Sequence, residues 1–143
     1  MAFRISSLMD TQLEMVFSRL RKTADFAGAD FSDLNATSAD GDNALHCVVR
    51  WGDIPAAKTL IDAGIDVNRA GDLGYTPLHV TCMKGNAEMV KLLIDSGADM
   101  FALSEGDPPF TSARLGGHDR ICKILAPLME KAQRGDPKGM GSG

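Results

Sequence analysis

The sequence repeats itself at a spacing of about 33 residues, and this spacing limits the folds open to the chain. A shift of 33 aligns Gly41 with Gly74, Leu45 with Leu78, His46 with His79, Gly52 with Gly85, Leu60 with Leu93, Gly64 with Gly97 and Asp66 with Asp99. A further shift of 32 aligns Gly74 with Gly106, Pro77 with Pro109, Leu78 with Phe110, Gly85 with Gly117, Met89 with Ile121 and Leu93 with Leu125. Such self-similarity predicts stacked units, each too small to bury its own apolar face without a neighbour.

Each unit carries the start and stop signals of two short helices. In the second unit, Thr76 can cap a helix that begins at Pro77, where the missing N–H costs nothing. Gly85 allows a tight turn into a second helix, and Gly97 is suited to a left-handed cap at its end. We expect Pro127 to kink or interrupt the last helix. The predicted helices cover residues 43–51, 54–63, 77–84, 87–96, 110–115 and 119–131.

A separate amphipathic helix precedes the repeats. Its apolar residues follow helical spacing: Met9, Leu13, Val16, Phe17 and Leu20. We expect this helix, at about 7–26, to cover the open face of the first repeat. At 143 residues, the chain is predicted to form one domain over 1–134, with repeats at about 38–70, 71–102 and 103–132. The polar, glycine-rich segment 135–143 is expected to be disordered.

The motifs of the second unit resemble the ankyrin repeat. They are Gly-Tyr-Thr-Pro-Leu-His at 74–79, Glu-Met-Val-Lys-Leu-Leu at 88–93 and Gly-Ala-Asp at 97–99. The first unit has Asn-Ala-Leu-His at 43–46, whereas the third diverges to Pro-Pro-Phe-Thr at 108–111. The resemblance covers about 33–131 and implies an all-α solenoid of about three helix-turn-helix units. Divergence of the third unit fits a terminal repeat, because one face of that repeat meets water.

Composition and charge exclude several classes of protein. The 15 Lys and Arg and 19 Asp and Glu give a net charge of −4, which argues against general affinity for nucleic acid or an anionic membrane. No apolar run approaches the roughly 18 residues of a membrane span, and the N-terminus lacks the order of a signal peptide. A cytoplasmic location is therefore expected. The three cysteines, Cys47, Cys82 and Cys122, are widely spaced and predicted to be reduced thiols.

No group of residues suggests catalysis or a cofactor. His46 and His79 share one repeat position, where the resemblance implies a hydrogen bond within the turn. It likewise implies a structural role for His118 at the start of a second helix, and for Asp66 and Asp99 in turns. We therefore expect no catalytic residue, no cofactor and no metal site.

The resemblance implies that a protein partner binds the fingers, which are the loops before the first helix of each repeat, and the exposed side of those helices. The predicted binding residues are Asp40, Asp42, Arg50, Trp51, Asp72, Leu73, Tyr75, Met83, Lys84, Glu105, Asp107 and Leu115. The finger positions hold five carboxylates without Lys or Arg, and the helix positions offer Trp51, Met83 and Leu115 in a row. An apolar centre with a charged margin is typical of an interface.

Two alternatives stay open for these residues. Asp is common in turns for local reasons, so the acidic fingers are either a surface for a basic partner or a solvated edge. Trp51 is either an exposed anchor for the partner or packed against the N-terminal helix.

This compact single-domain chain looks like the small bacterial ankyrin proteins, some of which are immunity proteins against toxins such as nucleases. This analogy favours a non-catalytic inhibitor, monomeric when free, that binds a basic protein and gains association rate from its acidic surface. The alternative is an adaptor or regulatory subunit that scaffolds a complex or masks a transcription factor.

Overall fold

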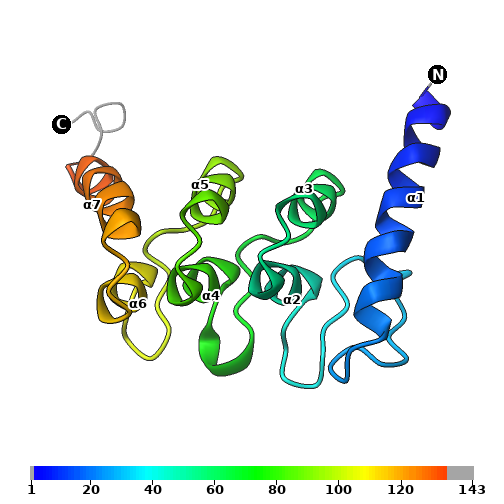
Figure 1. The fold of residues 1–143 in the computed structure, drawn as a ribbon, viewed down its shortest axis with the longest axis horizontal. Helices are drawn as coiled ribbons and strands as arrows, with labels where there is room; N and C mark the ends of the chain where they lie inside the picture. The colour runs from blue at the N-terminus through cyan, green and yellow to red at the C-terminus, as the bar shows by residue number, and fades with distance from the viewer. Residues whose placement is uncertain (1, 135–143) are drawn as a thin grey trace.

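The computed structural model describes residues 2–134, with side chains from Thr11 onward, and it forms an all-α stack (Figure 1). The expected disorder of 135–143 falls outside the described residues. The described helices are α1 (Ala2–Arg21), α2 (Ala44–Trp51), α3 (Ile54–Asp62), α4 (Pro77–Lys84), α5 (Ala87–Asp95), α6 (Pro109–Leu115) and α7 (Asp119–Gln133), with a short 3-10 turn η1 (Asp72–Gly74). The repeat helices agree with their predicted ranges to within two residues.

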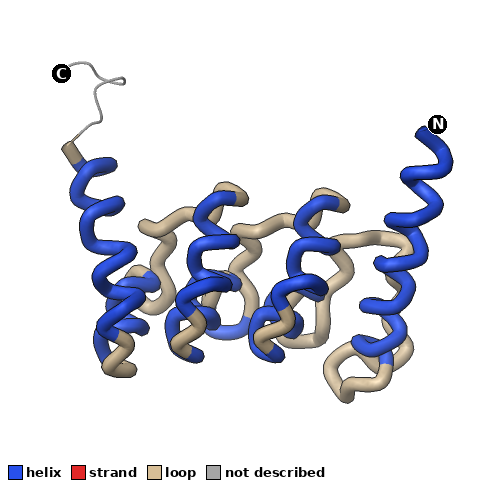
Figure 2. The backbone as a smooth tube through the Cα atoms, turned by 45° about the horizontal axis from the view of Figure 1, so that its top comes forward, coloured by secondary structure: helices blue, strands red, loops and turns tan. Residues whose placement is uncertain are grey.

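The helices form two layers. Helices α2, α4 and α6 lie side by side in one layer, and α3, α5 and α7 lie above them in Figure 1. The fingers, which we place at 37–43, 71–76 and 104–108, project from the first layer, away from the second (Figure 1). Figure 2 shows the same order, with α1 beside the first helix pair and its N-terminal part reaching beyond the stack. The predicted repeat solenoid is thus confirmed.

The predicted caps explain why the repeat helices begin and end where they do. The side-chain oxygen of Asn43 accepts the backbone N–H groups of Leu45 and His46, and Thr76 does the same for His79. Gly52 and Gly85 end α2 and α4 with φ of 75° and 82°, a region that favours glycine. The first helices of the first two repeats are therefore closed at both ends by local chemistry, whereas α6 begins after Pro108 without a side-chain cap.

Helix α1 covers the first repeat, but it begins and ends about five residues earlier than the predicted 7–26. Just beyond the helix, the hydroxyl of Thr23 donates to the carbonyl of Leu20 at 2.6 Å, and no Gly or Pro interrupts the chain near the start of α1. The side chains of Val16, Phe17 and Leu20 are buried against the stack. Met9, part of the predicted apolar stripe, lies where side chains are not described.

The loop after α1 completes this cover with aromatic residues. Phe26 and Phe31 are buried, and the rings of Phe17 and Phe31 stack with centroids 4.4 Å apart.

Of the two effects expected of Pro127, a kink or an interruption, the interruption is wrong, because α7 continues to Gln133. Pro127 lies on the exposed side, where water can satisfy the carbonyl left without an intrahelical partner.

Candidate protein-binding surface

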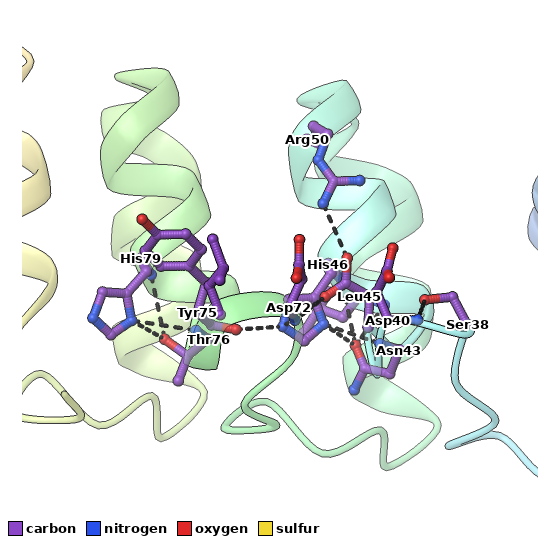
Figure 3. A network of polar contacts seen from close by, with 12 residues as sticks. Ser38, Asp40, Asn43, Leu45, His46, Arg50, Asp72, Tyr75, Thr76 and His79 are labelled. Carbon is purple, nitrogen blue, oxygen red and sulfur yellow. Dashed lines mark hydrogen bonds and ion pairs between the residues drawn. The ribbon is translucent and has the colours of Figure 1, made fainter. Parts of the chain in front are cut away.

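The geometry of the fingers is set by two buried histidines. In His46, Nδ1 accepts the backbone N–H of Asn43 at 3.0 Å, so Nε2 carries the proton and donates to the carbonyl of Tyr75 at 2.8 Å (Figure 3). His79 repeats the arrangement, accepting from Thr76 and donating to the carbonyl of Asp107 at 2.9 Å. The predicted bond within the turn is present. The second bond, to the next finger, was not predicted.

Burial lowers the pKa of both histidines, so each is held as the neutral imidazole. The carboxylate of Asp42, 4.0 Å from His46 Nε2, opposes this shift in the pKa of His46 but does not outweigh desolvation. Neutral histidines in these positions are structural and leave no free ring nitrogen for general acid or base chemistry.

The prediction that Asp42 is a free fingertip carboxylate is wrong. Its side chain is buried; one oxygen accepts from the guanidinium of Arg50 at 3.2 Å, and the other accepts the backbone N–H of Asp72 at 2.9 Å. Figure 3 shows Arg50 reaching from α2 toward the finger to make this contact. Asp42 therefore links the first finger to Arg50 of α2 and to the second finger, and both side chains stabilise the fold.

Gly71 makes this contact possible, and sequence reasoning did not single it out. A Cβ atom at this position would lie 2.0 Å from the Oδ1 atom of Asp42 and 2.9 Å from the Nε2 atom of His46. The first and second fingers therefore approach too closely for any side chain at residue 71. No local signal in the sequence distinguishes this glycine, because the constraint comes from the preceding repeat.

Trp51 packs against α1, as the alternative interpretation held. The Arg19 guanidinium lies 4.4 Å from the centroid of its ring and also contacts Asp53 at 2.6 Å. This contact lowers the pKa of Asp53. The ring is still 37% exposed. The predicted row of Trp51, Met83 and Leu115 is therefore wrong, because the repeat places Arg50 in line with the other two.

Two adjoining cavities lie between the fingers and the first helices, and we call them the proximal and the distal pocket. The proximal pocket, of about 290 Å³, is lined by Asp42, Arg50, Asp72, Tyr75, Val80, Met83 and Lys84. The distal pocket, of about 330 Å³, is lined by Tyr75, His79, Met83, Ser104, Glu105, Asp107, Thr111, Ser112, Leu115 and Gly116. Tyr75 and Met83 line both, so the pockets form one continuous groove.

The groove brings together nine of the twelve predicted binding residues and leaves out Asp40, Trp51 and Leu73. Asp40 is exposed on the first finger, and Leu73 is 59% exposed with a φ of 58° on the second. Four of the five predicted carboxylates, namely Asp40, Asp72, Glu105 and Asp107, remain exposed.

The described part of the chain shows no sign of metal binding or of a membrane span. No group of three or more metal-ligating side chains is found within it, and no described helix is long and apolar enough to cross a membrane. His118 packs against Gly85, and its Nε2 lies 3.1 Å from the carbonyl of Met83. The cysteines form no disulfide; burial raises the pKa of Cys82 to about 12 and also raises that of Cys47.

The comparisons with known proteins agree with this architecture. A family model described as ankyrin repeats (3 copies) matches residues 10–104 and 69–136, which together span most of the chain. A search of curated proteins found no significant match. The chain belongs to the ankyrin-repeat family, and its repeats indicate a protein–protein interaction module.

Proposed function

We propose that this protein is a non-catalytic inhibitor that binds a basic protein through the groove and the acidic fingers. The observation that carries the proposal is a groove lined by the exposed carboxylates of Asp72, Glu105 and Asp107 and by the apolar side chains of Met83 and Leu115. Asp40 adds a further exposed carboxylate on the first finger. A nuclease toxin is one such partner, because an enzyme that binds phosphate carries cations around its site. The proposed location is the cytoplasm, and the free protein is proposed to be monomeric.

Steering by charge supports an inhibitory role. Complementary charges raise the rate of encounter between proteins, which benefits an inhibitor that must reach its target before the target acts. The apolar side chains of the groove supply contact area once the proteins have met. Met83 is 40% exposed and Leu115 74% exposed, so both have surface to lose on binding.

The test begins with affinity capture from the native host and identification of the partner by mass spectrometry. Titration calorimetry and association kinetics at two salt concentrations then compare the original chain with two variants. One carries Asp72→Lys and Glu105→Lys in the fingers. The matched control carries Asp62→Lys and Asp95→Lys at the ends of α3 and α5, so both variants change the net charge equally.

We expect the finger variant to lose at least about tenfold in affinity, equal to about 1.4 kcal/mol, and to associate more slowly. The control should bind like the original chain. Equal binding by both variants, with an association rate that does not respond to salt, would overturn the proposal.

An adaptor is the second candidate, since the same surface would serve it. If the captured partner is an enzyme, its activity with one equivalent of this protein separates the two roles. An inhibitor abolishes turnover, whereas an adaptor leaves it intact.

A further inference from the structure

We infer that the distal pocket holds a single arginine side chain of the partner protein, with its guanidinium group between the carboxylates of Glu105 and Asp107. This inference rests on the proposed function and assigns one position in the partner to one place in the groove. Three features carry it: the charge of the pocket, its walls and the rigidity of its third finger.

The two pockets differ in charge. The proximal pocket is lined by two carboxylates, Asp42 and Asp72, and by two cations, Arg50 and Lys84. The distal pocket is lined by Glu105 and Asp107 without any Lys or Arg. Neither of these carboxylate groups forms a hydrogen bond or an ion pair with another described residue. Of the two pockets, only the distal one therefore offers a cation two carboxylate groups that no other described side chain already binds.

The walls of the distal pocket suit the stem of a long side chain. Tyr75, Met83 and Leu115 present an aromatic ring, a thioether and an aliphatic side chain beside the carboxylates. The volume of about 330 Å³ lies at the low end of the range of about 300–1,000 Å³ for ligand sites. Arginine fits better than lysine, because its planar group binds carboxylates through several donors and stacks on aromatic rings.

The backbone that carries both carboxylate residues is fixed in the third finger before any partner arrives. Ser104 and Asp107 exchange backbone hydrogen bonds of 2.9 and 3.0 Å, which makes a tight hairpin with Glu105 at its tip. The buried hydroxyl of Ser104 donates to the carbonyl of Leu73 at 2.7 Å, and His79 donates to the carbonyl of Asp107. Binding to a surface already ordered costs little conformational entropy.

The test uses N-acetyl-arginine methylamide as the probe and follows backbone amide signals by NMR. We expect saturable shifts at residues 104–107 and around Tyr75, with dissociation constants in the millimolar range because the probe is small. The citrulline analogue has nearly the same shape without charge, and it should bind at least about tenfold more weakly. This comparison uses the unmodified chain, so it does not depend on the folding of any variant.

A pair of variants with equal net charge locates the site. Glu105→Gln with Asp107→Asn should lower affinity for the probe at least about tenfold, whereas Asp62→Asn with Asp95→Asn, at the ends of α3 and α5 and away from the groove, should change it less than about twofold. Shifts centred elsewhere, equal binding of citrulline, or an unchanged affinity in the first variant would each overturn the inference.

The outcomes separate this inference from the proposed function. If the arginine probe fails while the captured partner still binds through the acidic fingers, the assignment of arginine is wrong and the proposed function stands. If the partner's binding does not depend on the finger carboxylates, the proposed function fails whatever the probe does.

Discussion

At one end of the described stack the first repeat is covered by a separate helix, whereas at the other end the third repeat has altered residues of its own. Helix α1 buries Val16, Phe17 and Leu20 against the first repeat. In the third repeat, Arg114 is exposed at the position where Cys82 is fully buried in the second. One end gains an apolar cover, and the other replaces apolar residues with polar ones.

The histidine position shows the same difference. His46 and His79 each donate to a carbonyl of the following finger, and the third repeat, with no following finger among the described residues, has Thr111 at this position. A buried imidazole without an acceptor would cost free energy, so histidine suits this position where a neighbouring finger supplies a carbonyl. The comparison teaches that the residue at this position is tied to a contact with the adjacent repeat.

Removing residues 1–24 should have the largest effect, because it exposes the apolar face of the first repeat. We expect aggregation or loss of cooperative thermal unfolding, measured by circular dichroism. A milder form is Leu20→Ala, which should lower the free energy of unfolding by about 2–5 kcal/mol. The matched control at the other end, Leu128→Ala, should cost no more than about 0.5 kcal/mol, since Leu128 is 39% exposed. A truncated chain with an unchanged melting temperature would refute the covering role.

Exchanging histidine and threonine between repeats tests whether the position depends on the neighbour. His79→Thr leaves the carbonyl of Asp107 and the N–H of Thr76 without their partner, so we expect a loss of about 1–3 kcal/mol in urea unfolding. Thr111→His should change stability by no more than about 0.5 kcal/mol, because Thr111 is only half-buried. Equal costs at both positions would show that the site is equivalent in every repeat.

Acidification should weaken the interior of the stack. Since burial lowers the pKa of His46 and His79, the unfolded chain binds protons below its ordinary histidine pKa of about 6.5 while the native chain does not. The stability from these residues is therefore complete above about pH 6.5 and is lost as pH falls toward their folded pKa values.

Urea midpoints should decrease between pH 7.5 and pH 5.5. The variant His79→Thr, which lacks one of the two buried histidines, should lose part of this pH dependence. A midpoint that stayed constant or rose on acidification would contradict the neutral state of the two buried histidines.

Thiol reactivity should show the smallest difference between the repeats. Cys122 is half-buried in the terminal repeat, whereas Cys47 and Cys82 are buried within the stack. We expect one thiol to react quickly with a disulfide reagent and two to react only in denaturant. Adding reductant should leave the melting temperature unchanged, and a large decrease would reveal a disulfide.

The repeat helices were predictable because their signals are local. Capping residues, Pro77 and the left-handed glycines lie within a few residues of the ends they determine, so the spacing of about 33 placed six helices to within two residues. The bounds of α1 were not predictable in the same way. No glycine or proline marks its C-terminal end, and the Thr23 hydroxyl that donates to the carbonyl of Leu20 there is not a strong sequence signal.

The binding surface was predictable only in outline. The repeat register identified the groove positions, but it treated the finger carboxylates as equivalent. Asp42 differs from Asp40 because Arg50, Asp72 and the bare backbone of Gly71 meet it in three dimensions. Trp51 was ambiguous for the same reason, since Arg19 lies 32 residues away in sequence. Contacts between units carry this information, and a one-dimensional pattern does not.

The bond from each histidine to the following finger has a consequence for how such a chain changes length. If the third unit were duplicated, the first copy would have Thr111 at the position that must donate a hydrogen bond to the finger of the second copy. The two copies would therefore pack together poorly. The second unit donates to the next finger through His79 and accepts the bond from His46 in its own finger. A copy of this unit can therefore make both bonds to its neighbours. Longer descendants should therefore arise by duplication of an internal segment, and engineered insertions should be made between the second and third units.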